Sequence, residues 1–233
     1  MRFATVDTDK GQLFGAIVEG GFVALSEAFP QWATMRDVIA AGGLAELEQA
    51  AEGRDVSHAE GSFHYAIPVP NSEKIICVGV NFPDRNAEYK DGQEAPPNMS
   101  LFPRFARSFT GHGEALVRPP ETPQLDYEGE IAIVIGKGGR RISQADAMKH
   151  IAAISLCNEG TLRDWVRHAK FNVTQGKNWD SSGAIGPWLV TRDEIADVQN
   201  LSLTLDVNGE RRQTGSTSTM IFTVAQIVAH LST

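Results

Sequence analysis

The sequence has few cysteines, no long apolar run and no glycine-rich phosphate loop of either usual form. The first two absences exclude whole classes of protein. Only two of its 233 residues are cysteine, so the fold cannot rest on the disulfide framework of small secreted domains. No stretch approaches the roughly 18 apolar residues of a membrane-spanning helix. The N-terminal residues also lack the apolar core of a signal peptide. We therefore expect a cytoplasmic protein that does not bind membranes.

Basic residues are also scarce. The chain has 21 lysines and arginines against 29 aspartates and glutamates, a formal net charge of −8. A nucleic-acid surface needs clustered positive charge, so we expect no nucleic-acid partner. Cys77 and Cys157 both lie in apolar runs. They are interpreted as buried structural thiols, with a catalytic role as the alternative.

The chain divides into a small N-terminal unit and a larger, β-rich remainder. Residues 1–70 contain strand-like runs and a helical spacing of apolar residues between positions 32 and 52, which indicates a small α/β unit. The polar segment that ends in Ile67-Pro68-Val69-Pro70 marks the boundary. Residues 71–233 form the second predicted domain, and the whole chain is predicted to be α+β.

Three local patterns organise the second domain. Ile75–Val80 is a continuous apolar run, which indicates a buried strand. The polar, proline-containing stretch from Phe82 to Ser100 is interpreted as a binding lid. Alternating apolar residues at 201–207, followed by Asn208-Gly209, predict a β-hairpin with a type I′ turn.

Acidic residues alternate at Asp126, Glu128 and Glu130, directly before an apolar run. In one strand, alternate side chains share a face, so the three carboxylates would lie side by side. Like charges beside apolar surface repel one another unless a cation intervenes. Oxygen ligands suit a hard ion such as Mg²⁺, Mn²⁺ or Ca²⁺. The alternative is a solvated edge strand with acidic side chains.

Two further clusters could contribute to such a site. Glu159 follows the apolar run Ile151–Cys157, and the end of a buried strand is a suitable place for a third carboxylate. Lys177 follows Gly176 and precedes an aromatic residue. By itself this lysine would be an unremarkable surface residue in a salt bridge. His112, between two glycines, could face the site or be a hydrogen-bonded loop histidine.

Taken in order, these motifs resemble the fumarylacetoacetate hydrolase family. The resemblance covers residues 74–233 and rests on Gly79-Val80-Asn81-Phe82, Asp126-Tyr127-Glu128-Gly129-Glu130, Asn158-Glu159 with Arg163-Asp164, Gly176-Lys177 and Gly186-Pro187-Trp188.

The resemblance implies a mixed β-roll with few helices and a homodimer. It implies that Glu128, Glu130 and Glu159 bind one divalent metal, Mg²⁺ or else Mn²⁺ or Ca²⁺. Lys177 is expected to contact a substrate oxygen and to take part in catalysis. Asn81 and Arg104 are expected to bind substrate.

The sequence departs from the family pattern at four places. Glu159 stands where the family usually has aspartate, and Arg104 replaces a lysine. Arg85 and Glu88 occupy the lid positions of a histidine and a glutamate. Family members continue past the position of Thr233, so we expect a C-terminal part of the family domain to be missing.

The replacement in the lid changes the expected base. Arginine stays protonated and cannot accept a proton, so we predict that Glu88 is the catalytic base. Arg85 would then hold Glu88 or bind a substrate carboxylate. A solvated ion pair between these two residues is the alternative, and His112 is the next candidate for the base.

The function that follows from the resemblance is metal-dependent hydrolysis of a C–C bond in a 2-oxo acid of the acylpyruvate type. A hydratase, a lyase or a 2-oxo-acid decarboxylase could use the same metal site, because fold does not determine function. An inactive metal-binding remnant is the alternative outside enzymes.

Overall fold

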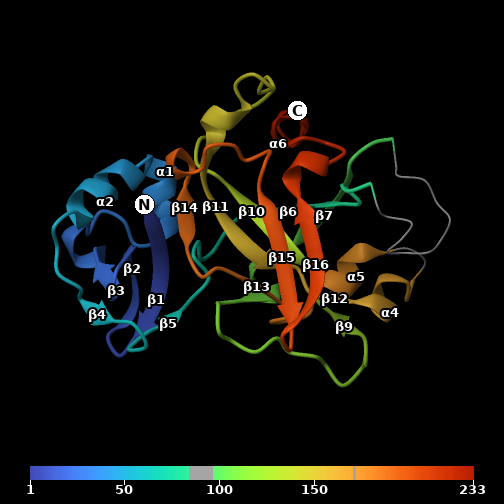
Figure 1. Ribbon diagram of the computed structural model, residues 1–233, viewed down its shortest axis with the longest axis horizontal. Helices are drawn as coiled ribbons and strands as arrows, with labels where there is room; N and C mark the ends of the chain where they lie inside the picture. The colour runs from blue at the N-terminus through green and yellow to red at the C-terminus, as the bar shows by residue number, and fades with distance from the viewer. Residues whose placement is uncertain (84–96, 170–171) are drawn as a thin grey trace.

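A computed structural model describes residues 1–83, 97–169 and 172–233 of the chain. Figure 1 shows an N-terminal unit on the left and a larger β-rich part on the right, with the C-terminus near the top. The main sheet has ten strands in the order β4-β3-β2-β1-β14-β11-β13-β8, with β10 on β11 and β5 on β1. Because β13 and β8 pair in parallel and the other neighbours are antiparallel, the sheet is mixed, and the expected α+β class is confirmed.

The N-terminal unit packs around two apolar clusters, one of which contains Phe3 and the other Val6. Its strands are β1 (Arg2–Thr8), β2 (Gly11–Val18), β3 (Gly21–Ala24), β4 (His58–Ala59) and β5 (His64–Tyr65), and its helices are η1 (Ser26–Ala28), α1 (Met35–Ala41) and α2 (Leu44–Ala51). The helical stretch divides in two because Gly42 adopts a left-handed φ of 72° and ends α1. Phe3, Val38 and Leu47 are fully buried between the sheet and these helices.

The sheet continues across the boundary expected at residue 70. β1 pairs with β14 (Leu189–Thr191), and β14 pairs with β11 (Ile151–Asn158). The expected boundary itself falls in the loop between β5 and β6 (Ile75–Gly79). Residues 1–70 therefore share a hydrogen-bonded sheet with the rest of the chain.

The larger part is built mainly from short strands. They are β7 (Ser100–Arg104), β8 (Phe109–Thr110), β9 (Leu125–Asp126), β10 (Gly129–Ile135), β12 (Thr161–Leu162), β13 (Gly183–Ile185), β15 (Ser202–Val207) and β16 (Glu210–Ser216). Its helices are η2 (Ala106–Ser108), η3 (Ala147–His150), α4 (Arg163–Val166), α5 (Val173–Lys177), η4 (Arg192–Glu194), η5 (Thr217–Thr219) and α6 (Val224–Leu231). The predicted hairpin is confirmed, since Asn208 and Gly209 join β15 to β16 with φ of 54° and 80°.

The acidic segment differs from the single strand that its spacing predicted. Tyr127 and Glu128 form a link between β9 and β10. Asp126 pairs with Thr161 of β12, whereas Gly129 pairs with Asn158 of β11. The three carboxylates are therefore carried by two strands and the link between them, and the expectation of one shared strand face was wrong.

A second apolar core lies under the C-terminal helix. Val224 and Val228 of α6 pack with Ala147 of η3 and with Ile151 and Ile154 of β11. This core anchors the connection between β10 and β11 against α6. Within the described ranges, no helix has both the length and the apolar composition needed to cross a bilayer.

Candidate functional site

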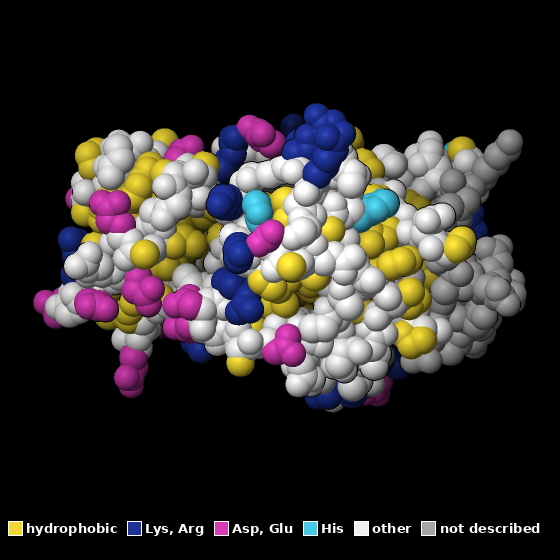
Figure 2. Space-filling model, turned by 90° about the horizontal axis from the view of Figure 1, so that it is seen from above, with side chains coloured by type: hydrophobic (Ala, Val, Ile, Leu, Met, Phe, Trp, Pro, Cys, Tyr) yellow, Lys and Arg dark blue, Asp and Glu magenta, His cyan; other side chains and the backbone are white. Residues whose placement is uncertain are grey.

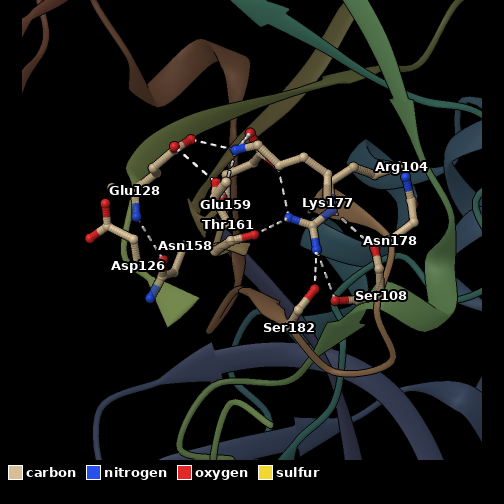
Figure 3. A network of polar contacts seen from close by, with 12 residues as sticks. Arg104, Ser108, Asp126, Glu128, Asn158, Glu159, Thr161, Lys177, Asn178 and Ser182 are labelled. Atoms are coloured by element: carbon tan, nitrogen blue, oxygen red, sulfur yellow. Dashed lines mark hydrogen bonds and ion pairs between the residues drawn. The ribbon is translucent and has the colours of Figure 1, made fainter. Parts of the chain in front are cut away.

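Lys177 lies at the centre of a buried polar network (Figure 3). Its side chain is about 4% exposed, and its Nζ lies 2.5 Å from Glu128 Oε2 and 2.6 Å from Glu159 Oε2. A third hydrogen bond of 3.0 Å goes to the Glu159 carbonyl oxygen. An ammonium group has three donors, so all of them are used. The alternative of a surface salt bridge is excluded.

Gly176 allows the lysine to reach this position. A Cβ at Gly176 would lie 2.3 Å from Val166 Cγ2 and 2.9 Å from the Leu162 carbonyl oxygen. Any side chain there would push α5 away from α4 and from the end of β12. Position 176 therefore has to be a glycine, because only then can α5 pack close enough for Lys177 to reach both carboxylates.

Arg104 at the end of β7 holds the other side of Glu159. Its guanidinium, about 2% exposed, donates to Glu159 Oε1 at 2.8 Å and to the Gly160 carbonyl at 3.1 Å. The remaining donors go to Ser108 Oγ at 3.0 Å, to the Ser108 carbonyl at 3.1 Å and to Ser182 Oγ at 2.9 Å. Arginine has five N–H donors, and all five are used within the protein. The substrate contact expected for Arg104 remains a prediction.

Glu128 is held from a second direction by residues that follow Glu159 in the sequence. Thr161 Oγ1 donates to Glu128 Oε1 at 2.9 Å, and Arg163 Nη2 lies 2.8 Å from the same oxygen. Arg163 Nε also donates to Asp126 Oδ2 at 2.8 Å. Acidic and basic side chains therefore alternate through the network, from Asp126 to Arg104.

Burial and neighbouring charges shift the pKa of several groups in this region. Burial raises the pKa of Glu159, Lys177 opposes that shift, and Glu128 adds to it. Burial, and after it the charge of Glu159, raises the pKa of Cys77 to about 12 and the pKa of Cys157 well above its usual value. Raised pKa values disfavour the reactive thiolate form of both cysteines. The two side chains are partly buried rather than fully buried as expected.

Other expected site residues contact other parts of the chain or belong to residues that the structure does not describe. Asn81 is buried at the end of β6, where its side chain donates to the Phe222 carbonyl at 3.0 Å and accepts from the Phe222 amide at 2.8 Å. His112 packs edge-on against Tyr65, with ring centroids 5.7 Å apart. Arg85 and Glu88 belong to residues 84–96, which the structure does not describe.

Sequence reasoning did not identify several members of the network. Thr161, Ser108 and Ser182 carry no local signal, because each is a common hydroxyl residue in an ordinary context. Arg163 belongs to one of the motifs that carry the family resemblance, but it was given no role in the site. Its position shortly after Glu159 offers a countercharge to the acidic segment.

The donor chemistry of this region fits a divalent cation. Two carboxylates, Glu128 and Glu159, converge on one positive charge, the Lys177 ammonium. Carboxylate oxygens are the ligands that Mg²⁺, Mn²⁺ and Ca²⁺ prefer. Glu130, half-buried on β10, lies opposite Cys157 of β11. In the described residues no three His, Cys, Asp or Glu side chains are already grouped as a metal-binding set, so Glu130 would have to join the pair.

The family model of the C-terminal domain of fumarylacetoacetate hydrolase matches residues 74–233 of the chain. Among curated relatives, oxaloacetate tautomerase YisK of Bacillus subtilis is 36% identical over 230 residues, which are 97% of this chain and 72% of that protein. The human mitochondrial oxaloacetate tautomerase FAHD2A is 36% identical over 169 residues, 72% of this chain and 53% of that protein.

Solved structures share the fold over the full length of the chain. A fumarylacetoacetate hydrolase from Exiguobacterium antarcticum is 29% identical with a TM-score of 0.83, and the match covers 100% of this chain and 81% of that one. A maleylpyruvate hydrolase from Sphingobium sp. SYK-6, solved with manganese(II) and pyruvate, is 22% identical with a TM-score of 0.80 and coverages of 100% and 83%. The expected fold, a β-rich roll with few helices, is thereby confirmed.

Proposed function

Because the chain belongs to the fumarylacetoacetate hydrolase family, we propose that it is a divalent-metal-dependent enzyme that interconverts the keto and enol forms of a 2-oxo acid, with oxaloacetate as substrate. The observation that carries this proposal is the buried Lys177 ammonium held between Glu128 and Glu159. The 36% identity to two oxaloacetate tautomerases supports the choice of reaction.

The proposed metal ligands are Glu128, Glu130 and Glu159, with Mg²⁺ as the proposed ion and Mn²⁺ or Ca²⁺ as substitutes. A cation bound there would supply Lewis acidity toward the oxygens of a 2-oxo acid. The protein contributes the orientation of the carboxylates. Arg104 and Lys177 bind the two oxygens of Glu159, and Thr161 and Arg163 bind Glu128.

Tautomerisation moves one proton from the carbon beside the carbonyl to the carbonyl oxygen. In this proposal one of the three Lys177 N–H groups exchanges its carboxylate partner for the substrate oxygen, to which the ammonium can donate a hydrogen bond and then a proton as negative charge develops. The acceptor for the carbon-bound proton is proposed to be Glu88, with Arg85 beside it to hold it or to bind the distal carboxylate of the substrate. Arg104 is proposed to act on substrate only through Glu159.

Hydrolysis of a C–C bond in an acylpyruvate is the second candidate. It uses the same enolate, which leaves when water attacks the neighbouring carbonyl. The observation that favours it is the 29% identity and full-length fold match to a fumarylacetoacetate hydrolase. The additional requirement is a positioned water molecule, which the tautomerase reaction does not need.

One experiment separates the two candidates. Enol oxaloacetate and acetylpyruvate are supplied in turn to the protein with Mg²⁺ or Mn²⁺, and loss of the enol absorbance and release of pyruvate are followed. The tautomerase proposal expects fast ketonisation of oxaloacetate, abolished by a chelator, and little cleavage of acetylpyruvate. Ketonisation at the uncatalysed rate with both metals would overturn it, and release of pyruvate from acetylpyruvate would move the conclusion to the hydrolase.

The homodimer and the cytoplasmic location expected from the sequence remain predictions. The exposed apolar side chains of Phe105, Leu156 and Ile135 are compatible with a second copy of the chain. Light scattering on the purified protein would measure its mass directly.

A further inference from the structure

The connection between β10 and β11, residues 136–150, forms a basic hollow at the surface. The hollow has a volume of about 420 Å³, and its lining includes Lys137, Arg140, Arg141, Asp146, Lys149 and His150. In Figure 1 this connection lies near the C-terminus at the top, whereas α5, β9 and β12 of the site lie at the lower right. The hollow is thus a second location, separate from the Lys177 network.

The charges of the hollow are largely unneutralised. Lys137, Arg140 and Arg141 are exposed, and none of them forms an ion pair with an acidic residue in the described ranges. Asp146 is the single acidic residue of the lining, and its Oδ1 is already paired with Lys149 Nζ at 2.7 Å. Such a concentration of positive charge is unusual on a chain of net charge −8. Figure 2 shows dark blue side chains gathered on this face, with acidic side chains mostly toward the N-terminal unit.

Backbone contacts fix the hollow in place. The Arg141 amide donates to the Ser232 carbonyl at 2.7 Å, and the Ile142 amide donates to Ser232 Oγ at 2.8 Å. His150 Nδ1 lies 2.8 Å from the Lys137 carbonyl oxygen, which accepts its N–H. Arg141 itself holds a left-handed φ of 53°, which is a strained conformation for a residue with a side chain. The loop is therefore ordered before any ligand arrives.

We propose that this hollow binds a small anion that carries two or more phosphate groups, such as a nucleoside diphosphate or triphosphate. Guanidinium groups match phosphate oxygens in paired hydrogen bonds, and Lys137 adds a point charge. A single carboxylate would neutralise only one of the three unpaired cations. Because the hollow is open, the phosphates lie among the cations while the rest of the ligand stays at the surface.

Calorimetric titration with inorganic tripolyphosphate, in metal-free buffer at low salt, tests the proposal. Wild-type protein is expected to bind one equivalent, and the double variant Arg140→Gln/Arg141→Gln to bind at least tenfold more weakly. Lys137→Gln is expected to weaken binding less. Arg54→Gln, at an exposed arginine of the N-terminal unit, is the matched control and should leave affinity unchanged.

The result that would overturn the proposal is equal binding by the wild type and the double variant, or no saturable binding at all. Equal affinity for orthophosphate and tripolyphosphate would also overturn it, because it would remove the requirement for several phosphates. The altered side chains are exposed, so the variants should keep the wild-type melting temperature, and that measurement accompanies each titration.

Discussion

The Lys177 network and the basic hollow use the same kinds of side chain under opposite conditions. In the network, Lys177 and Arg104 are buried and every N–H of both groups meets an oxygen of the protein. In the hollow, Arg140 and Arg141 are exposed and have no acidic partner among the described residues. Burial makes an unpaired charge costly, whereas water solvates an exposed one. Buried lysine and arginine side chains therefore have partners within the protein, whereas exposed ones without an acidic partner remain available to a ligand.

The largest effect is expected from Lys177→Met. Removing one partner of a buried ion pair leaves an uncompensated charge, which costs about 3–5 kcal/mol, and here two carboxylates lose the same partner. Urea unfolding should show a decrease in stability of this size, and turnover of oxaloacetate should fall by orders of magnitude. Unchanged stability would mean that the network contributes nothing to the fold.

Lys177→Met also tests whether Glu128 and Glu159 bind a metal ion. Without the ammonium, Glu128 and Glu159 retain only their other partners, so a divalent cation should raise the melting temperature of Lys177→Met more than that of the wild type. A smaller shift in the variant would show that Lys177 does not compete with the cation for these carboxylates.

Glu130→Ala should weaken binding of Mg²⁺ or Mn²⁺ by at least about tenfold, which corresponds to about 1.4 kcal/mol. The reason is the loss of one of three proposed carboxylate ligands. Calorimetric titration measures the affinity, with Glu121→Ala as the control at an exposed acidic residue. Equal affinities in the wild type and Glu130→Ala would remove Glu130 from the ligand set.

Arg104→Lys should lower the free energy of unfolding by about 1–3 kcal/mol, because an ammonium has too few donors for five acceptors. The Ser108 carbonyl and Ser182 Oγ are the acceptors expected to lose their donors. Thermal unfolding compares this variant with Arg107→Lys at an exposed position. If both variants unfold like the wild type, the five hydrogen bonds of Arg104 are not a source of stability.

Arg107→Ala should have the smallest effect. Its Nη2 lies 2.8 Å from Asp180 Oδ2, and the two side chains are 85% and 69% exposed. An exposed pair contributes about 0–1 kcal/mol and less at high salt. If urea unfolding shows a loss of stability above this range, exposed charge pairs would contribute as buried ones do, and the contrast between the two would fail.

Local patterns predicted much of the fold. The hairpin at Asn208-Gly209 follows from alternation and turn chemistry, which act over a few residues. The apolar run at Ile75–Val80 does form a strand, β6, but the expectation that it would be buried was wrong, since no residue of β6 is buried and Ile76 is 45% exposed. Burial depends on what covers the strand, and β6 pairs with β7 in a separate two-stranded sheet. The break at Tyr127 was missed because β9 and β10 pair with different strands, and strand partners are a property of the whole sheet. Spacing alone treats such a segment as one strand.

The network shows why part of a site escapes sequence reasoning. Glu128, Glu159 and Lys177 were identified as chemistry-bearing residues through the motifs around them. Lys177 contacts Glu159 and Glu128, which are 18 and 49 residues away along the chain. The local spacing of residues carries no signal for contacts between such distant positions. The same holds for Arg104 and Ser182, which are 78 residues apart.

The pairing of β1 with β14 shows that the domain boundary predicted at residue 70 is not a boundary of the folded sheet. A chain cut at residue 70 would lose β1 and leave β14 with an open edge. Unpaired strand edges recruit other chains and promote aggregation. Residues 1–70 therefore cover the edge of the sheet that supports the site. A shortened protein that contains the catalytic part alone would need a replacement strand to pair with β14.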